Sequence, residues 1–434
     1  MSQKQLSQSK IEILGDNILL EEKQLTAFYI LPLANYSVVS TAGIENNVNR
    51  LTHILSELAI QKPNVKFSIQ RCVKSIRAED IKANLLDTIK LYNPTYSMPY
   101  EFTSKLKDAS QTYCLLAVKL DPSDVVNVED VSFLDTVKSE VGKLSSAIFD
   151  TSSDDYDLEK VLALEKSIFA ILSDKCVRAS KDLVFYSYVS RLYPMYDISY
   201  DKLSFFNNST YSSILGSVTQ TVEDKFGYFI MHNEGIDEFD IEPVDTYGCI
   251  VNVFEFPKVF DISRGLISSY KEFYDNMQIN IETLSREQAT STIVRRRGTV
   301  LAESQEAVKA GAQTDRFSEL MDLKSSADRA MSLLENREVF CKFNVSFLVT
   351  GTSLEKLRQN ITLLITDLKY NNIVATKSLT QARDFLQGFV KLQPTTLNQF
   401  GQLLFPLSLQ INVGSVVGES QDSKFAAPAI GEDI

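Results

Sequence analysis

The stretch that decides the fold runs from Arg337 to Gln393 and reads REVFCKFNVSFLVTGTSLEKLRQNITLLITDLKYNNIVATKSLTQARDFLQGFVKLQ. Its first part, Glu338 to Thr350, has apolar side chains at every second position, which is the period of a half-buried strand. These side chains are Val339, Cys341, Phe343, Val345 and Phe347. Gly351 ends the alternation, so the sequence predicts a strand over 338–350.

A helix is predicted directly after this strand. Thr352 and Glu355 form a capping-box pattern, in which a hydroxyl and a carboxylate three residues apart satisfy free amides at a helix start. The apolar residues that follow have helical spacing; they are Leu354, Leu357, Ile361, Leu364, Ile365 and Leu368. After a turn at Asn371-Asn372 we expect a short strand over 373–376. A second helix begins at Ser378 with Gln381 and is stopped by Pro394. The stretch therefore predicts a β-α-β-α module built on one face of a sheet.

The order of predicted strands and helices divides the whole chain into three regions. Residues 1–150 are predicted to be an N-terminal α/β domain, with strands at 26–31, 66–73 and 111–120 and helices after Gly43, at 77–91 and at 130–149. Residues 151–224 are predicted to be a helical connection. Residues 225–434 are predicted to be a second α/β domain with strands at 226–231, 247–256 and 277–284 and a helix at 261–274. A helical hairpin, about residues 285–336 and broken near Gly311, is inserted into it. The predicted class is α/β (α+β), with ferredoxin-like split β-α-β units.

Composition narrows the class of protein. The 434 residues include 56 Asp and Glu against 44 Lys and Arg, a net charge of −12, so we expect no autonomous nucleic-acid binding. The five cysteines are far apart and show no CxxC, which predicts buried thiols of a reducing compartment. The start MSQKQLSQSK lacks an apolar signal core, and no apolar run approaches the ~20 residues that span a bilayer. We therefore expect a cytoplasmic or peripheral protein.

The second half of the chain resembles the amino-terminal region of the conjugation and type IV secretion ATPases, the CagE/TrbE/VirB component family. The matching residues are Gln381, Phe385 and Pro394, because in that family a Gln, a helix with Phe and then a Pro lie just upstream of the motor. The stretch Tyr247 to Pro257 (YGCIVNVFEFP) and the helical region after it also match. The resemblance implies a platform that contacts inner-membrane secretion-channel proteins, other copies of itself or a P-loop ATPase subunit. It also implies a peripheral position at the inner face of the cell membrane, and a linker after Leu403 that leads to a motor domain using ATP and Mg.

The phosphate-binding motif of that motor is absent from the chain. The pattern G-x-x-x-x-G-K-[ST], whose amides and lysine cradle phosphates, does not occur. At the nearest dipeptide, Gly142-Lys143, Val137 replaces the first glycine and Leu144 replaces the hydroxyl residue. We therefore expect no cofactor and no catalytic activity from this chain alone. The resemblance therefore implies a motor domain that is a separate polypeptide, has been truncated or has been lost.

Arg295, Arg296 and Arg297 form the densest basic cluster and are the one candidate site. They could contact a phosphate or an acidic partner. The alternative is a solvated face of the hairpin, with Glu303 and Glu306 nearby.

Two other groups of residues were weighed as metal or catalytic sites. The acidic loop from Glu234 to Asp245 could hold a divalent cation, but it lacks the ligand spacing and central glycine of a calcium loop, which favours a solvated connection. His53 and His232 are the only histidines, and neither has a partner at metal-ligand spacing. No catalytic, cofactor or metal residue is therefore predicted.

The sequence leads to one main hypothesis and two alternatives. The first is a docking and assembly module, the non-nucleotide-binding part of a conjugative DNA-transfer ATPase. The second is a free-standing structural or scaffold protein of a phage or mobile element. The third is an enzyme whose site has no recognisable constellation of acid, base and nucleophile.

Overall fold

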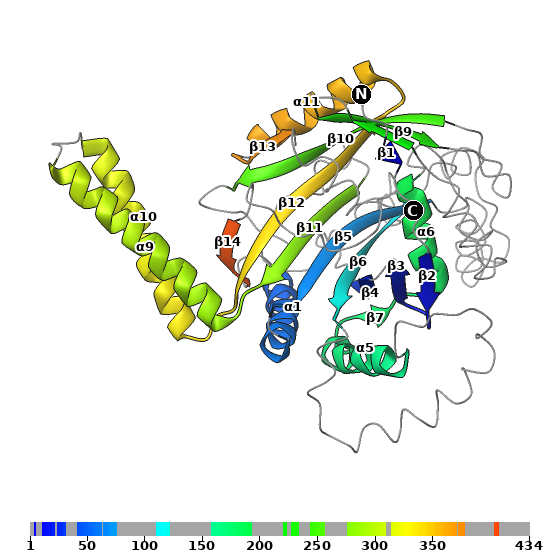
Figure 1. Ribbon diagram of the computed structural model, residues 1–434, viewed down its shortest axis with the longest axis horizontal. Helices are drawn as coiled ribbons and strands as arrows, with labels where there is room; N and C mark the ends of the chain where they lie inside the picture. The colour runs from blue at the N-terminus through cyan, green and yellow to red at the C-terminus, as the bar shows by residue number, and fades with distance from the viewer. Residues whose placement is uncertain are drawn as a thin grey trace, which may run out of the picture.

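The computed structural model describes residues 4–5, 11–21, 24–31, 41–62, 64–75, 110–121, 158–192, 220–223, 227–233, 244–256, 276–309, 314–370, 372–377 and 403–407. Over these ranges the chain has a mixed α/β fold with one large antiparallel sheet and six helices (Figure 1). The helices are α1 (Thr41–Gln61), α5 (Leu158–Leu172), α6 (Lys181–Leu192), α9 (Arg286–Lys309), α10 (Thr314–Glu335) and α11 (Leu354–Tyr370).

The sheet has fourteen strands and includes strands from both halves of the chain. From the first half come β1 (Lys4–Gln5), β2 (Ile11–Leu14), β3 (Ile18–Glu21), β4 (Gln24–Leu31), β5 (Lys66–Ser75), β6 (Ser110–Leu120) and β7 (Val177–Arg178). From the second half come β8 (Gln220–Glu223), β9 (Tyr228–Asn233), β10 (Val244–Glu255), β11 (Asn276–Thr283), β12 (Phe340–Gly351), β13 (Val374–Lys377) and β14 (Leu403–Pro406). The main order is β1-β8-β9-β10-β12-β11-β5-β6-β4-β3-β2.

The two halves repeat one pattern of strand pairing. In the first half β7 pairs with β4, β4 with β6, and β6 with β5. In the second half β13 pairs with β10, β10 with β12, and β12 with β11. One further strand in each half also corresponds. In the first half β3 pairs with β4 along the same edge as β7, and in the second half β9 pairs with β10 along the same edge as β13. The helical hairpin lies between β11 and β12.

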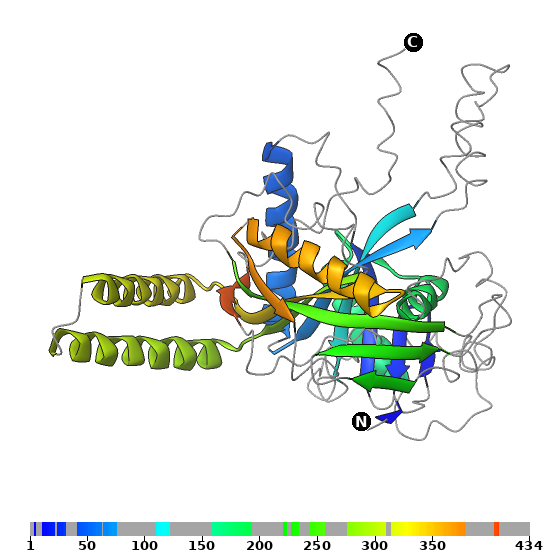
Figure 2. The same cartoon turned by 90° about the horizontal axis from the view of Figure 1, so that it is seen from above.

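The two halves join through an antiparallel ladder between β5 and β11, which runs from Lys66 opposite Glu282 to Arg71 opposite Met277. The sheet therefore continues without a break across the chain (Figures 1 and 2). The division into domains at residues 150 and 225 stays a prediction.

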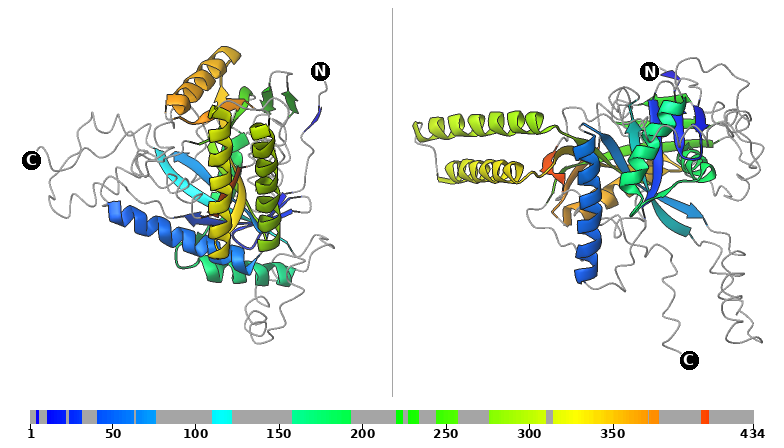
Figure 3. Two further views of the ribbon diagram at one scale, coloured as in Figure 1. Left: turned by 90° about the vertical axis from the view of Figure 1, so that its left-hand side faces the viewer. Right: turned by 90° about the horizontal axis from the view of Figure 1, so that it is seen from below.

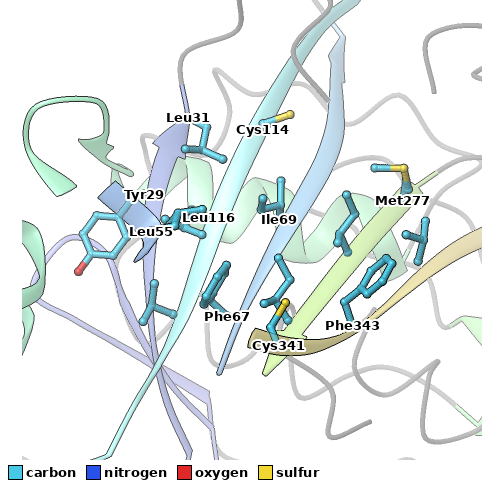
Figure 4. Packing of buried hydrophobic residues seen from close by; sticks show 14 of the residues in the cluster. Tyr29, Leu31, Leu55, Phe67, Ile69, Cys114, Leu116, Met277, Cys341 and Phe343 are labelled. Atoms are coloured by element: carbon cyan, nitrogen blue, oxygen red, sulfur yellow. The ribbon is translucent and has the colours of Figure 1, made fainter. Parts of the chain in front are cut away.

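One face of the sheet carries the hydrophobic core. Alternate residues of β4, β5, β6, β10, β11 and β12 point to this face, and buried residues of α1, α5 and α11 pack against them. Figure 4 shows part of this layer, with Tyr29, Phe67, Ile69, Leu116 and Met277 among the labelled side chains. The core crosses the join between the halves, since Ile69 and Ile279 are each 1% exposed.

The other face carries a row of buried polar side chains beside the join. Gln70, Gln278, Ser346 and Asn252 occupy paired positions on four neighbouring strands. Ser346 Oγ donates a hydrogen bond to Asn252 Oδ1 at 2.6 Å, and Asn344 Nδ2 donates to Ser346 Oγ at 2.8 Å. These bonds offset part of the desolvation cost of burying polar groups.

The structure corrects two expectations for the deciding stretch. The strand β12 is not half-buried: nearly all of its side chains are buried, because it lies inside the sheet with covered residues on both faces. The cap of α11 is Ser353, not the expected box of Thr352 and Glu355. The helix begins at Leu354, and the amide of Lys356 donates to Ser353 Oγ at 3.2 Å.

The remaining predictions in this stretch are confirmed where it is described. Leu357, Ile361, Leu364 and Leu368 are the buried stripe of α11. Asn372 ends the helix in the left-handed region with φ +59°, and its amide donates to the carbonyl of Lys369.

The helices predicted at 77–91, 130–149, 261–274 and after Ser378 lie outside the described residues, as do Gln381, Phe385 and Pro394.

Candidate partner-binding site on the helical hairpin

The hairpin of α9 and α10 projects away from the sheet as a separate arm (Figures 1 and 2). Figure 3 shows the two helices side by side from two further directions. The prediction of a hairpin over about 285–336 is confirmed by the two helices over 286–309 and 314–335.

A reciprocal capping box fixes the start of the arm. The amide of Ser285 donates to Gln288 Oε1 at 3.2 Å, and the amide of Gln288 donates to Ser285 Oγ at 3.3 Å. The amide of Ser285 also lies 3.2 Å from Asn64 Oδ1 in the turn after α1. The sequence S-x-x-Q carried this signal, and sequence analysis missed it.

Arg337 ends the arm in a conformation that favours glycine. Its φ is +65°, and its amide donates to the carbonyl of Leu334 while the amide of Glu338 donates to that of Leu333. This is the Schellman arrangement, whose left-handed position is most often a glycine because a Cβ is disfavoured there.

Two small apolar clusters hold the arm together. At the base, Leu284, Ala289, Ile293, Leu334 and Phe340 pack together. Farther out, the only buried pair found among the described residues is Val300 with Leu320. Two-helix hairpins gain most of their stability from packing an apolar face, and these clusters form that face at the positions whose side chains the structure describes.

The predicted arginine cluster lies on the exposed surface of α9. Arg297 Nε lies 2.8 Å from Asp328 Oδ1 on α10, with both side chains nearly half exposed. Arg295 and Arg296 are exposed. The three arginines therefore differ, because one joins the two helices of the arm and two face outward. Glu303 and Glu306 are also exposed, farther toward the tip.

A pocket of about 360 Å³ lies at the base of the arm. Its lining includes Ile60 from the end of α1, Ala289, Leu334, Phe340 and the rim residues Arg286 and Arg337. Ile60 is 65% exposed. The pocket is mainly apolar, its charged lining residues are Arg286, Arg337 and Glu338, and its volume falls at the low end of small-ligand sites.

The structure also places the other candidate residues. His53 is exposed on α1. His232 Nδ1 lies 2.7 Å from Asp245 Oδ1, because the two residues are paired across β9 and β10. Sequence analysis had found no partner for His232. Residues 234–243 of the acidic loop and the dipeptide Gly142-Lys143 lie outside the described residues. In the described part of the chain no cluster of three or more His, Cys, Asp or Glu side chains could hold a metal ion.

Among the cysteines whose side chains the structure describes, all are buried thiols outside any disulfide; they are Cys114, Cys176, Cys249 and Cys341. Burial raises the pKa of Cys176 to about 12 and raises the pKa of Cys341 as well, because a thiolate is poorly solvated in the core. These thiols are structural at ordinary pH.

The chain matches no protein-family model and no curated protein. Within the described ranges, every helix is too short or too polar to cross a lipid bilayer.

Proposed function

We propose that this chain is a docking and assembly module of a conjugative DNA-transfer, or type IV secretion, ATPase. The observation that carries the proposal is the projecting arm of α9 and α10, with the exposed Arg295 and Arg296 on its surface. An arm of this kind suits binding to another protein, because it offers a long surface and its contacts leave the packing of the sheet and its helices unchanged. The resemblance of the second half to the amino-terminal region of these ATPases supports the choice of system.

The proposed platform consists of two ferredoxin-like split β-α-β units. The order β7-β4-β6-β5, read with the connecting helices α1 and α5, supports such a unit in the first half. The order β13-β10-β12-β11 supports a second unit, with the hairpin inserted between its second and third strands. A repeated unit whose edge strands pair is consistent with a duplicated ancestor.

The proposed partners are the inner-membrane channel proteins, other copies of the chain and a P-loop ATPase subunit. The proposed location is the cytoplasmic face of the cell membrane. ATP and Mg would belong to the P-loop subunit, since this sequence contains no G-x-x-x-x-G-K-[ST] motif.

A DNA-transfer assay in the native host tests the proposal. The natural gene is replaced by one encoding Arg295→Ala, Arg296→Ala and Arg297→Ala together, and the transfer frequency between donor and recipient cells is measured. We expect a loss of about a hundredfold or more, of the size that follows when charged hot-spot contacts are truncated. Lys356→Ala with Gln359→Ala, on the exposed side of α11, is the matched control and should leave transfer unchanged.

Two results would sink the proposal. One is unchanged DNA transfer in the triple variant at equal protein level. The other is a gene neighbourhood with capsid or tail genes and no membrane-channel set, which would favour a structural protein of a phage.

A further inference from the structure

The outer edge of β13, on the side away from β10, has no partner strand in the described part of the chain. There β13 pairs with β10 alone, from Lys377 opposite Val251 to Val374 opposite Glu255. β9 pairs with the first part of the same edge of β10, and α11 runs over this margin of the sheet and contacts β13 (Figure 1). An unpaired strand edge presents backbone N–H and C=O groups that can bond to another extended chain.

Three basic side chains lie along this edge. Lys377 Nζ donates a hydrogen bond to the hydroxyl of Tyr228 on β9 at 3.0 Å and lies 4.4 Å from the centre of the same ring. The guanidinium carbon of Arg358 on α11 lies 5.5 Å from that ring, so this side of α11 faces the edge. Lys369 comes eleven residues after Arg358, which is about three helical turns, and therefore lies on the same side of α11 about 16 Å farther along.

These three cations have no carboxylate partner among the residues that the structure describes. Arg358 and Lys369 are exposed, and Lys377 is half-buried. The edge is therefore locally basic, although the whole chain has a net charge of −12. Local charge of one sign at an open backbone edge favours a partner of the opposite sign.

The first half of the chain shows what the equivalent cation does beside a carboxylate. Arg178 of β7 lies opposite Tyr29, two residues beyond the end of the β3 ladder on β4. Lys377 of β13 lies opposite Val251, two residues beyond the end of the β9 ladder on β10. Arg178 forms an ion pair with Glu165 in the buried stripe of α5, whereas the buried stripe of α11 is entirely apolar. Lys377 therefore lacks the internal carboxylate that its counterpart has.

Apolar side chains are exposed beside the same edge. Val374 is 51% exposed, and Tyr370, at the end of α11, is 86% exposed. Side chains alternate along a strand, so Lys377 and the buried Ala375 lie on the α11 side of β13, and Val374 and Thr376 lie on the other side. An extended chain beside β13 would meet basic groups on one side and an apolar side chain on the other.

From these observations we propose that the outer edge of β13 binds an extended acidic segment of a partner protein by strand addition. Backbone groups of the segment bond to β13, and acidic side chains at every second position meet Arg358, Lys369 and Lys377. Apolar side chains between them lie against Val374. Tyr228 is a positioning residue, because it holds Lys377 beside the edge. This surface is separate from the arm of α9 and α10, so the inference goes beyond the proposed function.

Fluorescence anisotropy on the full chain tests the inference. The probe is a labelled peptide of sequence GSEVEVEVSG, and GSKVKVKVSG is its control. We expect the acidic peptide to bind at least about tenfold more tightly than the basic one, because several exposed charge pairs of modest strength act together.

Two substitutions on α11 locate the binding surface. Arg358→Glu with Lys369→Glu, both at exposed helical positions, should weaken binding of the acidic peptide by about tenfold or more. The matched control is Lys356→Glu with Arg329→Glu, which changes the net charge equally. Lys356 is exposed two residues before Arg358, on another side of α11, and Arg329 is exposed on α10, so this control should bind like the wild-type chain. Far-UV circular dichroism verifies that each variant is folded.

Backbone N-methylation separates strand addition from attraction between charges alone. Alternate amides of an added strand point toward β13 and the others point away from it. One version of the acidic peptide is N-methylated at its glutamates and another at its valines. We expect one version to lose at least about tenfold in affinity and the other to keep it, because only one set of amides donates to β13. Amide hydrogen exchange in residues 374–377 should slow when the unmethylated peptide binds.

Three results would overturn the inference. The first is equal binding of the acidic and basic peptides, and the second is undiminished binding by the Arg358→Glu, Lys369→Glu variant. The third is an equal effect of the two N-methylated versions, which would leave a contact without strand pairing. Binding of the wild-type chain to phosphatidylglycerol vesicles, with no binding of the peptide, would assign the edge to a membrane and also overturn it. None of these results depends on DNA transfer, so the inference stands or falls separately from the proposed function.

Discussion

Ile69 on β5 and Ile279 on β11 lie directly opposite each other, where the two halves of the sheet join. Each is 1% exposed, and both belong to the same core as α1, α5 and α11. The join is therefore a packed interior and not a contact between two separate surfaces.

Substitutions at Ile69 and Ile279 should be coupled. Ile69→Ala and Ile279→Ala should each lower the free energy of unfolding by about 2–5 kcal/mol. The double variant should differ from the sum by about 0.5–3 kcal/mol, because the two side chains are in contact. Urea unfolding measures these values. The control is a double-mutant cycle of Ile69→Ala with Leu368→Ala, two buried residues on the distant elements β5 and α11. Additive losses for both cycles would mean that the halves are energetically independent.

Ile361 and Gln359 test the buried face of α11. Ile361 is 4% exposed and Gln359 is exposed. Ile361→Ala should lower the free energy of unfolding by about 2–5 kcal/mol, since it leaves a cavity under the helix. Gln359→Ala should change it by less than about 0.5 kcal/mol. Equal effects in thermal or urea unfolding would show that the helix packs on another face.

Arg178→Ala should destabilise the packing of α5 on β4. Glu165 has a side chain only 5% exposed and accepts hydrogen bonds from Arg178 Nε at 2.9 Å and Arg178 Nη2 at 3.0 Å. Arg178 also covers the ring of Phe169 at 3.7 Å. Its loss leaves a buried carboxylate without its charge partner, at a cost of about 2–4 kcal/mol.

Urea unfolding at neutral pH measures this cost. The double variant Arg178→Ala with Glu165→Gln should recover part of it, because the buried charge is then removed. A double variant less stable than Arg178→Ala would contradict this account.

Arg337→Gly should raise stability. The residue is held at φ +65°, where glycine has no steric cost, so the expected gain is about 1 kcal/mol in thermal unfolding. Arg329→Gly is the matched control, because it lies inside α10 and should lose about 1 kcal/mol instead. A loss at Arg337 would mean that its side chain stabilises the base of the arm more than its backbone strains it.

Cys176 should resist alkylation in the native protein. Burial raises its pKa to about 12, so the neutral thiol dominates and at pH 8 only about one molecule in ten thousand carries the thiolate. The thiolate fraction rises with pH only as the pH approaches this pKa. Iodoacetamide labelling followed by mass spectrometry should find Cys176 unmodified at pH 8 and modified after denaturation. Rapid labelling in the native state would show that the site opens.

Local pattern was sufficient to predict most strands and helices that the structure describes. The period-two alternation around Phe343 and the helical stripe around Ile361 predict their elements because each depends on neighbours in sequence. The start of the chain carried a comparable signal, since Ile11–Leu14 and Ile18–Glu21 flank a turn at Gly15, but sequence analysis did not use it. The strands β7, β8 and β14 were also missed, because each has only two to four residues and is fixed by its partner strand.

What the sequence by itself determined is the class of fold, the stripe of α11, the hairpin and its arginine cluster, because these follow from spacing and composition along the chain. Only the tertiary structure decided that Ile69 meets Ile279, that His232 meets Asp245 and that Arg297 is tied to Asp328. The physical reason is that none of these contacts follows from the local pattern along the chain. The burial of one common core brings Ile69 and Ile279 together, the pairing of β9 with β10 brings His232 to Asp245, and the packing of α9 on α10 brings Arg297 to Asp328.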